Sequence, residues 1–364
     1  MERHNSTTRI SITNFLDAGA LLRHRDQWIL IEGPFTSATE ENHGEITITY
    51  PSFYNLSSRE PFVGAKSHSL SSEALQTLLK EFLDADSQNI TTAPLGKAPW
   101  VEPEKAHFQE AFDGIQLRIA QKEISKAVPA VFARSAQTVT ARERAEILLN
   151  LLVAPSTLSI YGFWHQGGGV LGATPEVLFE YAHGTIHTMA LAGTCPKTDR
   201  STRLDLLEDV KERGEHQLVI DDIVEVTSRL GRVEVANTEV VELPTLYHLK
   251  TNISVHCDEL PSFKKLMESL HPTPALGVSP RGYGYGWMQD YPGQKGRDGF
   301  GGPFMFHTPQ QAICLVAIRS LQWTPYESMI GSGCGIVAAS EIEREWRELY
   351  QKRYSVRKIL GLQL

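Results

Sequence analysis

Apolar residues recur along the chain at two spacings, and these predict a mixture of helices and strands. Spacing of about three to four residues is typical of amphipathic helices. It occurs in 71–85, 100–124, 141–154, 204–230, 263–270 and the C-terminal segment that begins near 342. Short runs rich in β-branched and aromatic residues, separated by glycine and turn residues, occupy most of 157–195 and 312–337. Such runs are typical of strands.

Most of the predicted strands follow one another with only short turns between them, so we expect antiparallel pairing through hairpins. We interpret Gly167–Gly169 as the tip of one hairpin, because no helix and lysine follow it as a phosphate-binding loop requires. Helices and strands occur in both halves of the chain. The sequence therefore predicts an α+β fold, a single large domain in which antiparallel sheets pack as a sandwich with flanking helices.

Two Glu-x-x-Glu pairs, far apart in the sequence, are the most informative polar residues. Glu212 and Glu215 extend the apolar stripe of their predicted helix, so both carboxylates should point inward. Glu345 and Glu348 lie in the C-terminal helix, where a solvated ion-pair face with Lys352 is the alternative explanation. An unpaired buried carboxylate is costly, and hard oxygen ligands suit a divalent cation. We therefore expect an acidic site that binds Mg2+.

A glycine-rich segment precedes the second acidic pair and adds to this prediction. Gly331, Gly333 and Gly335 have no Cβ to keep an anion from their backbone N–H groups. We therefore expect this segment, including Cys334, to contact a bound carboxylate.

The composition of the chain argues against several classes of function. The 364 residues carry a formal net charge of -8 and no cluster of basic and aromatic residues, which argues against nucleic acid as a partner. The N-terminus has no leader pattern, and no run of about 18 uncharged apolar residues occurs, so we expect a cytoplasmic protein without membrane association. The four cysteines lack CxxC spacing and are expected to be reduced and mostly buried.

Eight motifs occur in an order that resembles one enzyme family. They are LAGTCP, KERGEH, LYHLKT, LHPTPALGVSP, RDGFGGP, VAIRS, GSGCGIV and EREWRELYQK. The chain is similar in this respect to chorismate-utilising enzymes, namely isochorismate synthase, salicylate synthase and the large components of anthranilate and aminodeoxychorismate synthases. The resemblance covers about residues 100–364 and implies the anthranilate synthase type of fold. Residues 101–364 would form the chorismate-binding catalytic region, and residues 1–100 a β-rich N-terminal part of the same fold.

The resemblance also implies roles for individual residues. Lys126 matches the lysine that activates water, Glu176 matches the general acid, and His248 lies where relatives contact the substrate or leaving group. The implied substrate-binding residues are Gly193, Thr194, Phe300, Arg319, Gly333, Cys334, Gly335 and Lys352. The implied Mg2+ ligands are Glu212, Glu215, Glu345 and Glu348, with Glu215 and Glu348 favoured as direct ligands.

These implied roles agree with elementary chemistry. Addition of water at C2 of chorismate with loss of the C4 hydroxyl needs one group that removes a proton and another that delivers one. A lysine in a closed site can be the base, and a carboxyl beside Val177, Leu178 and Phe179 can stay protonated near neutral pH.

The preferred hypothesis is a Mg2+-dependent isochorismate synthase, an isomerase acting early in menaquinone or siderophore biosynthesis. A salicylate synthase remains open, since it performs the same hydration and then eliminates pyruvate. An ammonia-using anthranilate synthase component would need a glutamine amidotransferase partner, and relatives of that kind resemble one another in having Gln where Lys126 stands. Ala192 argues against an aminodeoxychorismate synthase, which would carry lysine there. A catalytically silent chorismate binder is the last alternative.

Overall fold

The computed structural model describes residues 10–24, 27–38, 44–86, 99–197, 203–243, 246–257, 259 and 261–362. Its helices are α1 (Ile12–Asp17), α2 (Ser72–Ala85), α3 (Lys105–Ala120), α4 (Ala141–Leu152), α5 (Arg203–Glu208), α6 (Val210–Thr227), α7 (Phe263–Leu270) and α8 (Ile342–Leu360). Short 3-10 helices lie at η3 (Arg281–Tyr283), η4 (Gly286–Asp290) and η5 (Gln294–Arg297). Among the helices in these ranges, none combines the length and hydrophobicity that crossing a bilayer requires.

The strands divide into three stretches of the chain. The first is β1 (Gly19–His24), β2 (Gln27–Ser37), β3 (Thr47–Thr49), β4 (Phe62–Leu70), β5 (Lys126–Ala127) and β6 (Ala130–Ser135). The second is β7 (Ser159–His165), β8 (Gly168–Thr174), β9 (Val177–Ala182), β10 (Thr185–Pro196), β11 (Gly231–Val235), β12 (Glu239–Glu242) and β13 (Leu246–Cys257). The third is β14 (Val278–Ser279), β15 (Pro303–His307), β16 (Ala312–Val316), β17 (Ser320–Trp323) and β18 (Ser328–Gly333).

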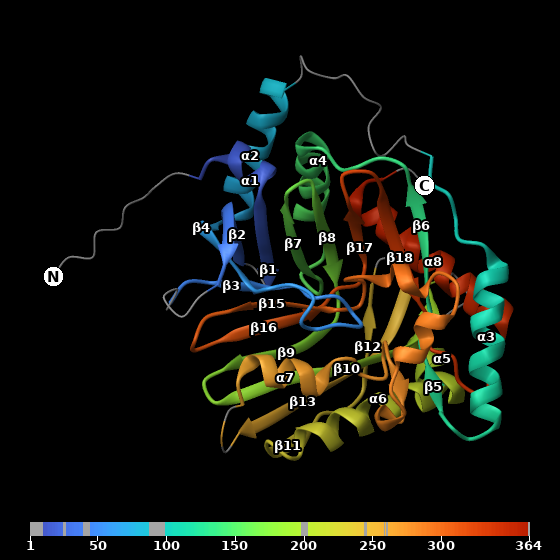
Figure 1. Cartoon of the computed structure of the whole chain (residues 1–364). Helices are drawn as coiled ribbons and strands as arrows, with labels where there is room; N and C mark the ends of the chain where they lie inside the picture. Colours follow the sequence, from blue (N-terminus) through green and yellow to red (C-terminus); the bar gives the residue numbers. More distant parts are fainter. Residues whose placement is uncertain are drawn as a thin grey trace.

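Sixteen strands of the described residues form one continuous sheet. Its order is β11-β13-β10-β9-β16-β15-β3-β4-β2-β1-β7-β8-β17-β18-β6, with β12 paired to β13. In Figure 1, β7, β8, β17, β18 and β6 run upright in the upper half, whereas β15, β16, β9, β10 and β13 cross the lower half. The predicted α+β fold with antiparallel strands is confirmed. The two halves belong to the same sheet, because β3, β4, β2 and β1 connect them.

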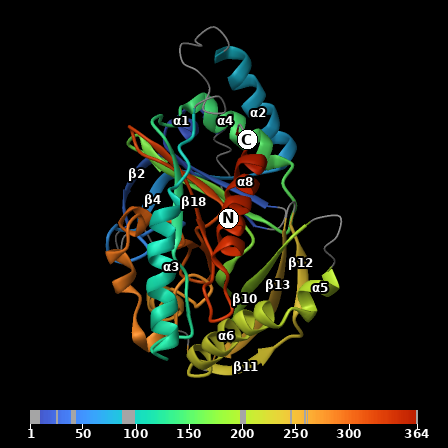
Figure 2. The ribbon, with the colours of Figure 1, turned by 90° about the vertical axis from the view of Figure 1, so that its right-hand side faces the viewer.

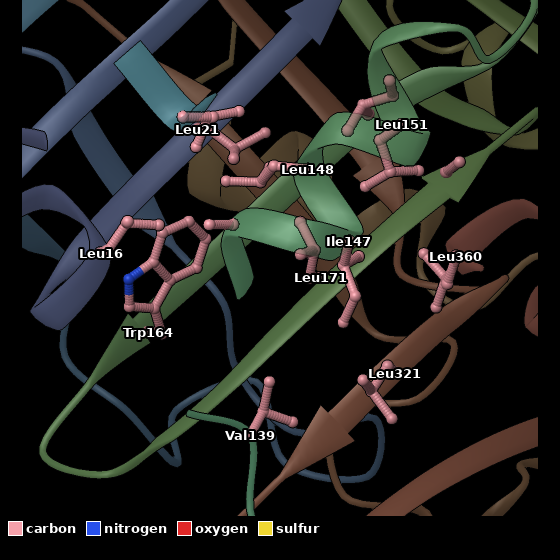
Figure 3. Close-up of a cluster of buried hydrophobic side chains, with 14 of the residues drawn as sticks. Leu16, Leu21, Val139, Ile147, Leu148, Leu151, Trp164, Leu171, Leu321 and Leu360 are labelled. Carbon is pink, nitrogen blue, oxygen red and sulfur yellow. The ribbon is translucent and has the colours of Figure 1, made fainter. Parts of the chain in front are cut away.

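Helix α4 covers the upper half of the sheet and forms its main core. Glu143 Oε2 accepts a hydrogen bond of 2.7 Å from the Thr140 backbone N–H, while Thr140 Oγ1 accepts one of 3.2 Å from the Glu143 N–H. This capping box fixes where the helix begins. Its buried residues Ile147, Leu148 and Leu151 face leucines of β1, β8 and β17 (Figure 3). Truncating one of these side chains to alanine should cost about 2–5 kcal/mol.

Two helices bring the acidic pairs toward the sheet. Helix α6 packs on β10 and β13, and α8 packs on β18 and α3. Figure 2 shows α3 and α8 on the same side of the molecule with α6 below them. The sequence predicted one helix over 204–230, but the structure divides it at Asp209. Asp209 is extended, with ψ 112°, and its side chain accepts a hydrogen bond of 3.0 Å from the Glu212 N–H, so it caps α6.

Candidate active site

A cleft lies where β10, β13 and β18 meet α6 and α8. The space within it, including its mouth, is about 610 Å³. Most of the residues predicted from the sequence line its walls: Glu176, Gly193, Thr194, Glu215, His248, Phe300, Arg319, Gly333, Gly335 and Lys352. Sequence reasoning did not single out Pro175, Leu191, Ala275, Leu276, Ile318 and Ser332, which also line it. These are mostly apolar or small residues whose types carry no chemical signal, but all of them except Pro175 belong to the quoted motifs, which could have marked them.

A bulge in β10 connects this strand to the first acidic pair. The register with β13 shifts between Ala192 and Thr194, and Gly193 between them has φ +78°. A Cβ at this position would lie 3.0 Å from the backbone oxygen of Glu212, so glycine suits both the backbone conformation and the close approach of α6. The bulge exposes the Thr194 N–H, which donates a hydrogen bond of 2.7 Å to Glu212 Oε2.

The acidic pairs lie in the first two turns of α6 and α8, where they come together, and they are buried. Glu212 and Glu345 are 1% and 0% exposed, and Glu215 and Glu348 are 8% and 9% exposed. A lysine that the sequence analysis did not single out lies among them. Lys211 Nζ is 3.0 Å from Glu212 Oε1, 2.9 Å from Glu345 Oε1 and 3.7 Å from Glu215 Oε2. One ammonium thus faces three carboxylates contributed by two helices.

This crowding changes the pKa values of the cluster. Burial, together with Glu215, raises the pKa of Glu212 to about 7. Burial and then Glu348 raise the pKa of Glu345. Burial opposes the charge of Lys211, but the carboxylates of Glu215, Glu212 and Glu345 outweigh it and raise the pKa of the ammonium well above its ordinary value. The cluster therefore needs cationic charge to keep its carboxylates ionised.

Lys126 lies on the other side of Glu215. Its side chain is 0% exposed, and its Nζ is 2.8 Å from Glu215 Oε1. The short strand that carries it, β5, pairs with β14. Burial opposes the charge of Glu215, but Lys126 and Lys211 outweigh it and hold the pKa of this carboxyl below its ordinary value. Gly335 lies against this ion pair, since a Cβ there would be 2.0 Å from Glu215 Oε1 and 2.6 Å from Lys126 Cε.

Glu176 is a buried carboxyl on the wall of the cleft, directly before β9. It is 5% exposed, and its backbone N–H donates a hydrogen bond of 3.2 Å to Thr174 Oγ1. Burial raises the pKa of Glu176 to about 7, although Lys126, Lys352 and Arg319 partly offset the effect. Glu176 can therefore hold a proton near neutral pH and give it to a bound ligand.

Arg319 points its guanidinium into the cleft from the bend between β16 and β17. Its φ is +57°, a left-handed conformation that is uncommon for a residue with a side chain and is often found at functional sites. Arg319 is 7% exposed, and burial lowers its pKa to about 10. It forms no ion pair of 4.0 Å or less with a carboxylate of the described residues. A buried guanidinium of this kind is suited to bind an anion.

His248 is the hydrogen-bonding partner that orients Arg319. Arg319 Nη2 lies 3.1 Å from His248 Nε2, and His248 Nδ1 lies 3.1 Å from Thr194 Oγ1. Arginine can only donate, so Nε2 accepts and Nδ1–H donates to the threonine. Burial and then Arg319 lower the pKa of His248 well below its ordinary value, in agreement with this neutral tautomer. His248 thus joins the β10 bulge to Arg319.

The glycine-rich segment and α8 complete the wall. Lys352 Nζ is 2.7 Å from Glu348 Oε1 and donates a hydrogen bond of 2.8 Å to the Gly333 carbonyl. Cys334 was expected at the substrate, but its side chain packs in the core formed by α3, β5 and α8 and is not on the wall of the cleft. Cys334 lies directly after the end of β18 and is 1% exposed, so its side chain is enclosed by that core.

The acidic cluster has the chemistry of a divalent-cation site. Both Glu345 oxygens are completely buried, and Oε1 lies 2.9 Å from the Lys211 ammonium. Carboxylate oxygens are the donors that Mg2+ prefers. Within the described ranges, no group of three or more His, Cys, Asp or Glu side chains is already arranged to hold a metal ion. Since Lys211 lies between the carboxylates, the donor set fits a cation once the ammonium moves.

Residues 57–361 match the sequence pattern of the family described as chorismate binding enzyme. The isochorismate synthase of salicylate biosynthesis from Pseudomonas aeruginosa is 32% identical over 199 residues, which are 52% of this chain and 42% of that protein. Isochorismate synthase MenF from Bacillus subtilis is 28% identical over 298 residues, 79% of this chain and 62% of that protein. The aligned part of the chain thus spans 42% and 62% of the length of these relatives.

The fold is also that of a solved relative. The structure of MenF, the menaquinone-specific isochorismate synthase from Escherichia coli, superposes with a TM-score of 0.75 and covers 97% of this chain and 92% of that one, at 19% identity. Because the family pattern covers most of the sequence and the fold agrees, this chain belongs to the chorismate-binding enzymes.

Proposed function

We propose that this protein is an isochorismate synthase, which converts chorismate to isochorismate. The observation that carries the proposal is the combination of Glu176, a buried carboxyl with a pKa of about 7, and the buried amine of Lys126 at one site. The reaction needs an acid and a base, and these two groups can supply them. The similarity to isochorismate synthases supports the same choice.

The proposed reaction balances without a net co-reactant. Once the ion pair of Lys126 with Glu215 has released one proton, the neutral Lys126 amine takes a proton from water, whose oxygen forms a bond to C2 of chorismate. The ring double bonds shift, the C4–O bond breaks, and the leaving hydroxyl takes the proton of Glu176 and departs as water. Proton transfer by a positioned side chain is typically worth about 10²–10⁴ in rate. One water enters and one leaves, so the overall change is an isomerisation.

The remaining residues would bind and orient the substrate. Arg319 is the group we assign to the pyruvyl carboxylate, because its guanidinium is buried without a carboxylate partner among the described residues. His248 would keep that guanidinium in place. Glu212, Glu215, Glu345 and Glu348 would hold Mg2+, which when bound supplies positive charge for the ring carboxylate.

Product analysis tests the proposal. Purified protein is incubated with chorismate and Mg2+, with and without ammonia, and the products are separated by chromatography. Isochorismate as the accumulating product is the expected result. Salicylate together with pyruvate would make the protein a salicylate synthase, and anthranilate formed only with ammonia would make it an anthranilate synthase component. Binding of chorismate without any turnover would mean that the protein is a catalytically silent chorismate binder.

A further inference from the structure

Lys211 occupies the centre of the acidic cluster. Its side chain is 8% exposed, and its Nζ lies within 3.0 Å of carboxylate oxygens from both α6 and α8. A surface lysine would extend into water, so this burial needs a compensating interaction. The compensation comes from Glu212, Glu215 and Glu345, whose negative charges raise the pKa of the ammonium.

Two cations cannot share these carboxylate oxygens. A divalent ion bound by Glu212, Glu215 and Glu345 would lie close to the point where the Lys211 ammonium now stands, and the repulsion between two such charges in a buried site is large. One of the two must therefore be absent when the other is bound.

The ammonium has a route out of the cluster. Lys211 lies in the first turn of α6, directly after Val210, which is 84% exposed. Arg344, whose side chain is 46% exposed, holds Glu212 Oε1 from the solvent side at 2.9 Å. A change of rotamer along the four-carbon stem can thus carry the ammonium to water while the helix stays in place.

We infer that Lys211 is an intramolecular competitor of the divalent cation, which neutralises the carboxylates of the metal-free enzyme and leaves the cluster when the metal binds. The inference rests on the proposed metal-dependent function. Lys211 keeps the metal-free site folded, and it lowers the affinity for the metal because each binding event must displace it.

Metal binding to the Lys211→Met variant tests this inference. Methionine keeps an unbranched stem without the charge. Arg213→Met is the matched control, since Arg213 is an exposed cation on the same helix. Calorimetric titration of metal-free protein with Mg2+ should give a dissociation constant several-fold lower for Lys211→Met than for the wild type, and an unchanged one for Arg213→Met. Equal or weaker binding by Lys211→Met overturns the inference.

Thermal unfolding of the same variants gives a second readout that needs no activity. In chelator, Lys211→Met should melt below the wild type, because its buried carboxylates have lost their counter-charge. Saturating Mg2+ should remove most of this difference in melting temperature between Lys211→Met and the wild type. A variant that melts like the wild type in chelator, or that gains no more from Mg2+ than the wild type does, contradicts the inference.

Labelling of the wild-type protein avoids the risk that a variant misfolds. An amine-acetylating reagent followed by mass spectrometry should modify Lys211 several-fold faster with Mg2+ than with chelator. Unchanged labelling, despite Mg2+ binding in the titration, overturns the displacement of Lys211 and leaves the proposed function intact. If the wild type binds no Mg2+ at all, both the metal dependence of the proposed function and this inference fail, and product analysis without metal then decides whether the reaction remains.

Discussion

Gly335 lies against Glu215 so closely that a Cβ at position 335 would be 2.0 Å from Glu215 Oε1. The same Cβ would be 2.6 Å from Lys126 Cε, so the glycine leaves room for the ion pair that joins the two side chains. The proposed base and a proposed metal ligand therefore depend on the absence of a side chain at a third position. This requirement gives a direct test of the site geometry.

Gly335→Ala should separate Lys126 from Glu215 and reduce turnover severely. Overpacking of this kind typically costs about 1–3 kcal/mol of stability. Gly214→Ala is the matched control, because a Cβ at position 214 has no neighbour within 4 Å and the residue lies in α6. That change should stabilise the protein by about 0.5–1 kcal/mol with activity retained. Urea unfolding and chorismate turnover measure both effects, and normal activity in Gly335→Ala would show that the ion pair is dispensable.

The proton of Glu176 predicts a pH dependence of turnover. The pKa of Glu176 is raised from 4.5 to about 7, so the acid form is present below about pH 7 and is lost as the pH rises through that value. The rate at saturating chorismate should fall on the alkaline side for this reason. Glu176→Gln should lower the rate by about 10²–10⁴ and abolish that limb of the profile. An unchanged alkaline limb in the variant would assign it to another group.

The same carboxyl predicts a change in stability with pH. Between pH 4.5 and about 7 the folded state holds a proton on Glu176 that the unfolded state has released, so the free energy of unfolding falls as the pH rises through this window. Above it, Glu176→Gln should be more stable than the wild type by about 3 kcal/mol, and below it the gain should vanish. Denaturant unfolding at pH 4 and at pH 8, one on each side of this window, checks the sign. A gain that is the same at both pH values would contradict the buried-acid assignment.

Arg319 should affect the binding of chorismate more than the chemical step. A charge-assisted hydrogen bond is worth about 1.5–3 kcal/mol, so Arg319→Met should raise KM by about 10- to 100-fold. Arg319→Lys keeps the positive charge but loses the planar guanidinium. Its KM should lie between those of Arg319→Met and the wild type. Steady-state kinetics on all three proteins separates KM from kcat. A decrease in kcat alone, with KM unchanged, would indicate that Arg319 acts in the chemical step and not in substrate binding.

Replacement of Lys126 should slow the chemical step and have little effect on the affinity for chorismate. Lys126→Met removes the proposed base and should lower kcat by about 10²–10⁴, while chorismate still binds at Arg319. Lys80→Met, on the exposed side of α2, serves as a control for the loss of one lysine. Fluorescence or calorimetric titration with chorismate gives the affinity of each variant. If Lys126→Met binds chorismate poorly but turns over the bound chorismate at the normal rate, Lys126 is not the catalytic base.

Periodicity was enough to predict several elements of the fold. The apolar stripe predicted α6 and the inward direction of Glu212 and Glu215, and both residues are buried. It could not predict the break before α6, because Asp209 ends one helix and caps the next through a local hydrogen bond. The pattern also could not predict that the strands form one continuous sheet. Alternation of apolar and polar residues indicates where strands are, but it does not specify which strands pair.

The site was predictable in its residues but not in all of its contacts. The ordered motifs marked His248 and Arg319, the family resemblance they established marked Glu176, and all three residues line one cleft. Lys211 was missed although it belongs to the KERGEH motif, because its long side chain reaches across to α8 and helical periodicity gives no information on such contacts. The bond from Arg319 to His248 was likewise invisible, as it depends on a left-handed residue between β16 and β17.

The origin of the oxygen at C2 tests the central claim most directly. Chorismate is turned over by the wild-type protein with Mg2+ in water enriched in oxygen-18, and the product is analysed by mass spectrometry. If Lys126 activates water for attack at C2, isochorismate should carry a single oxygen-18 atom in its new hydroxyl group. Unlabelled isochorismate, or an aromatic amine that appears only with ammonia, would contradict the account.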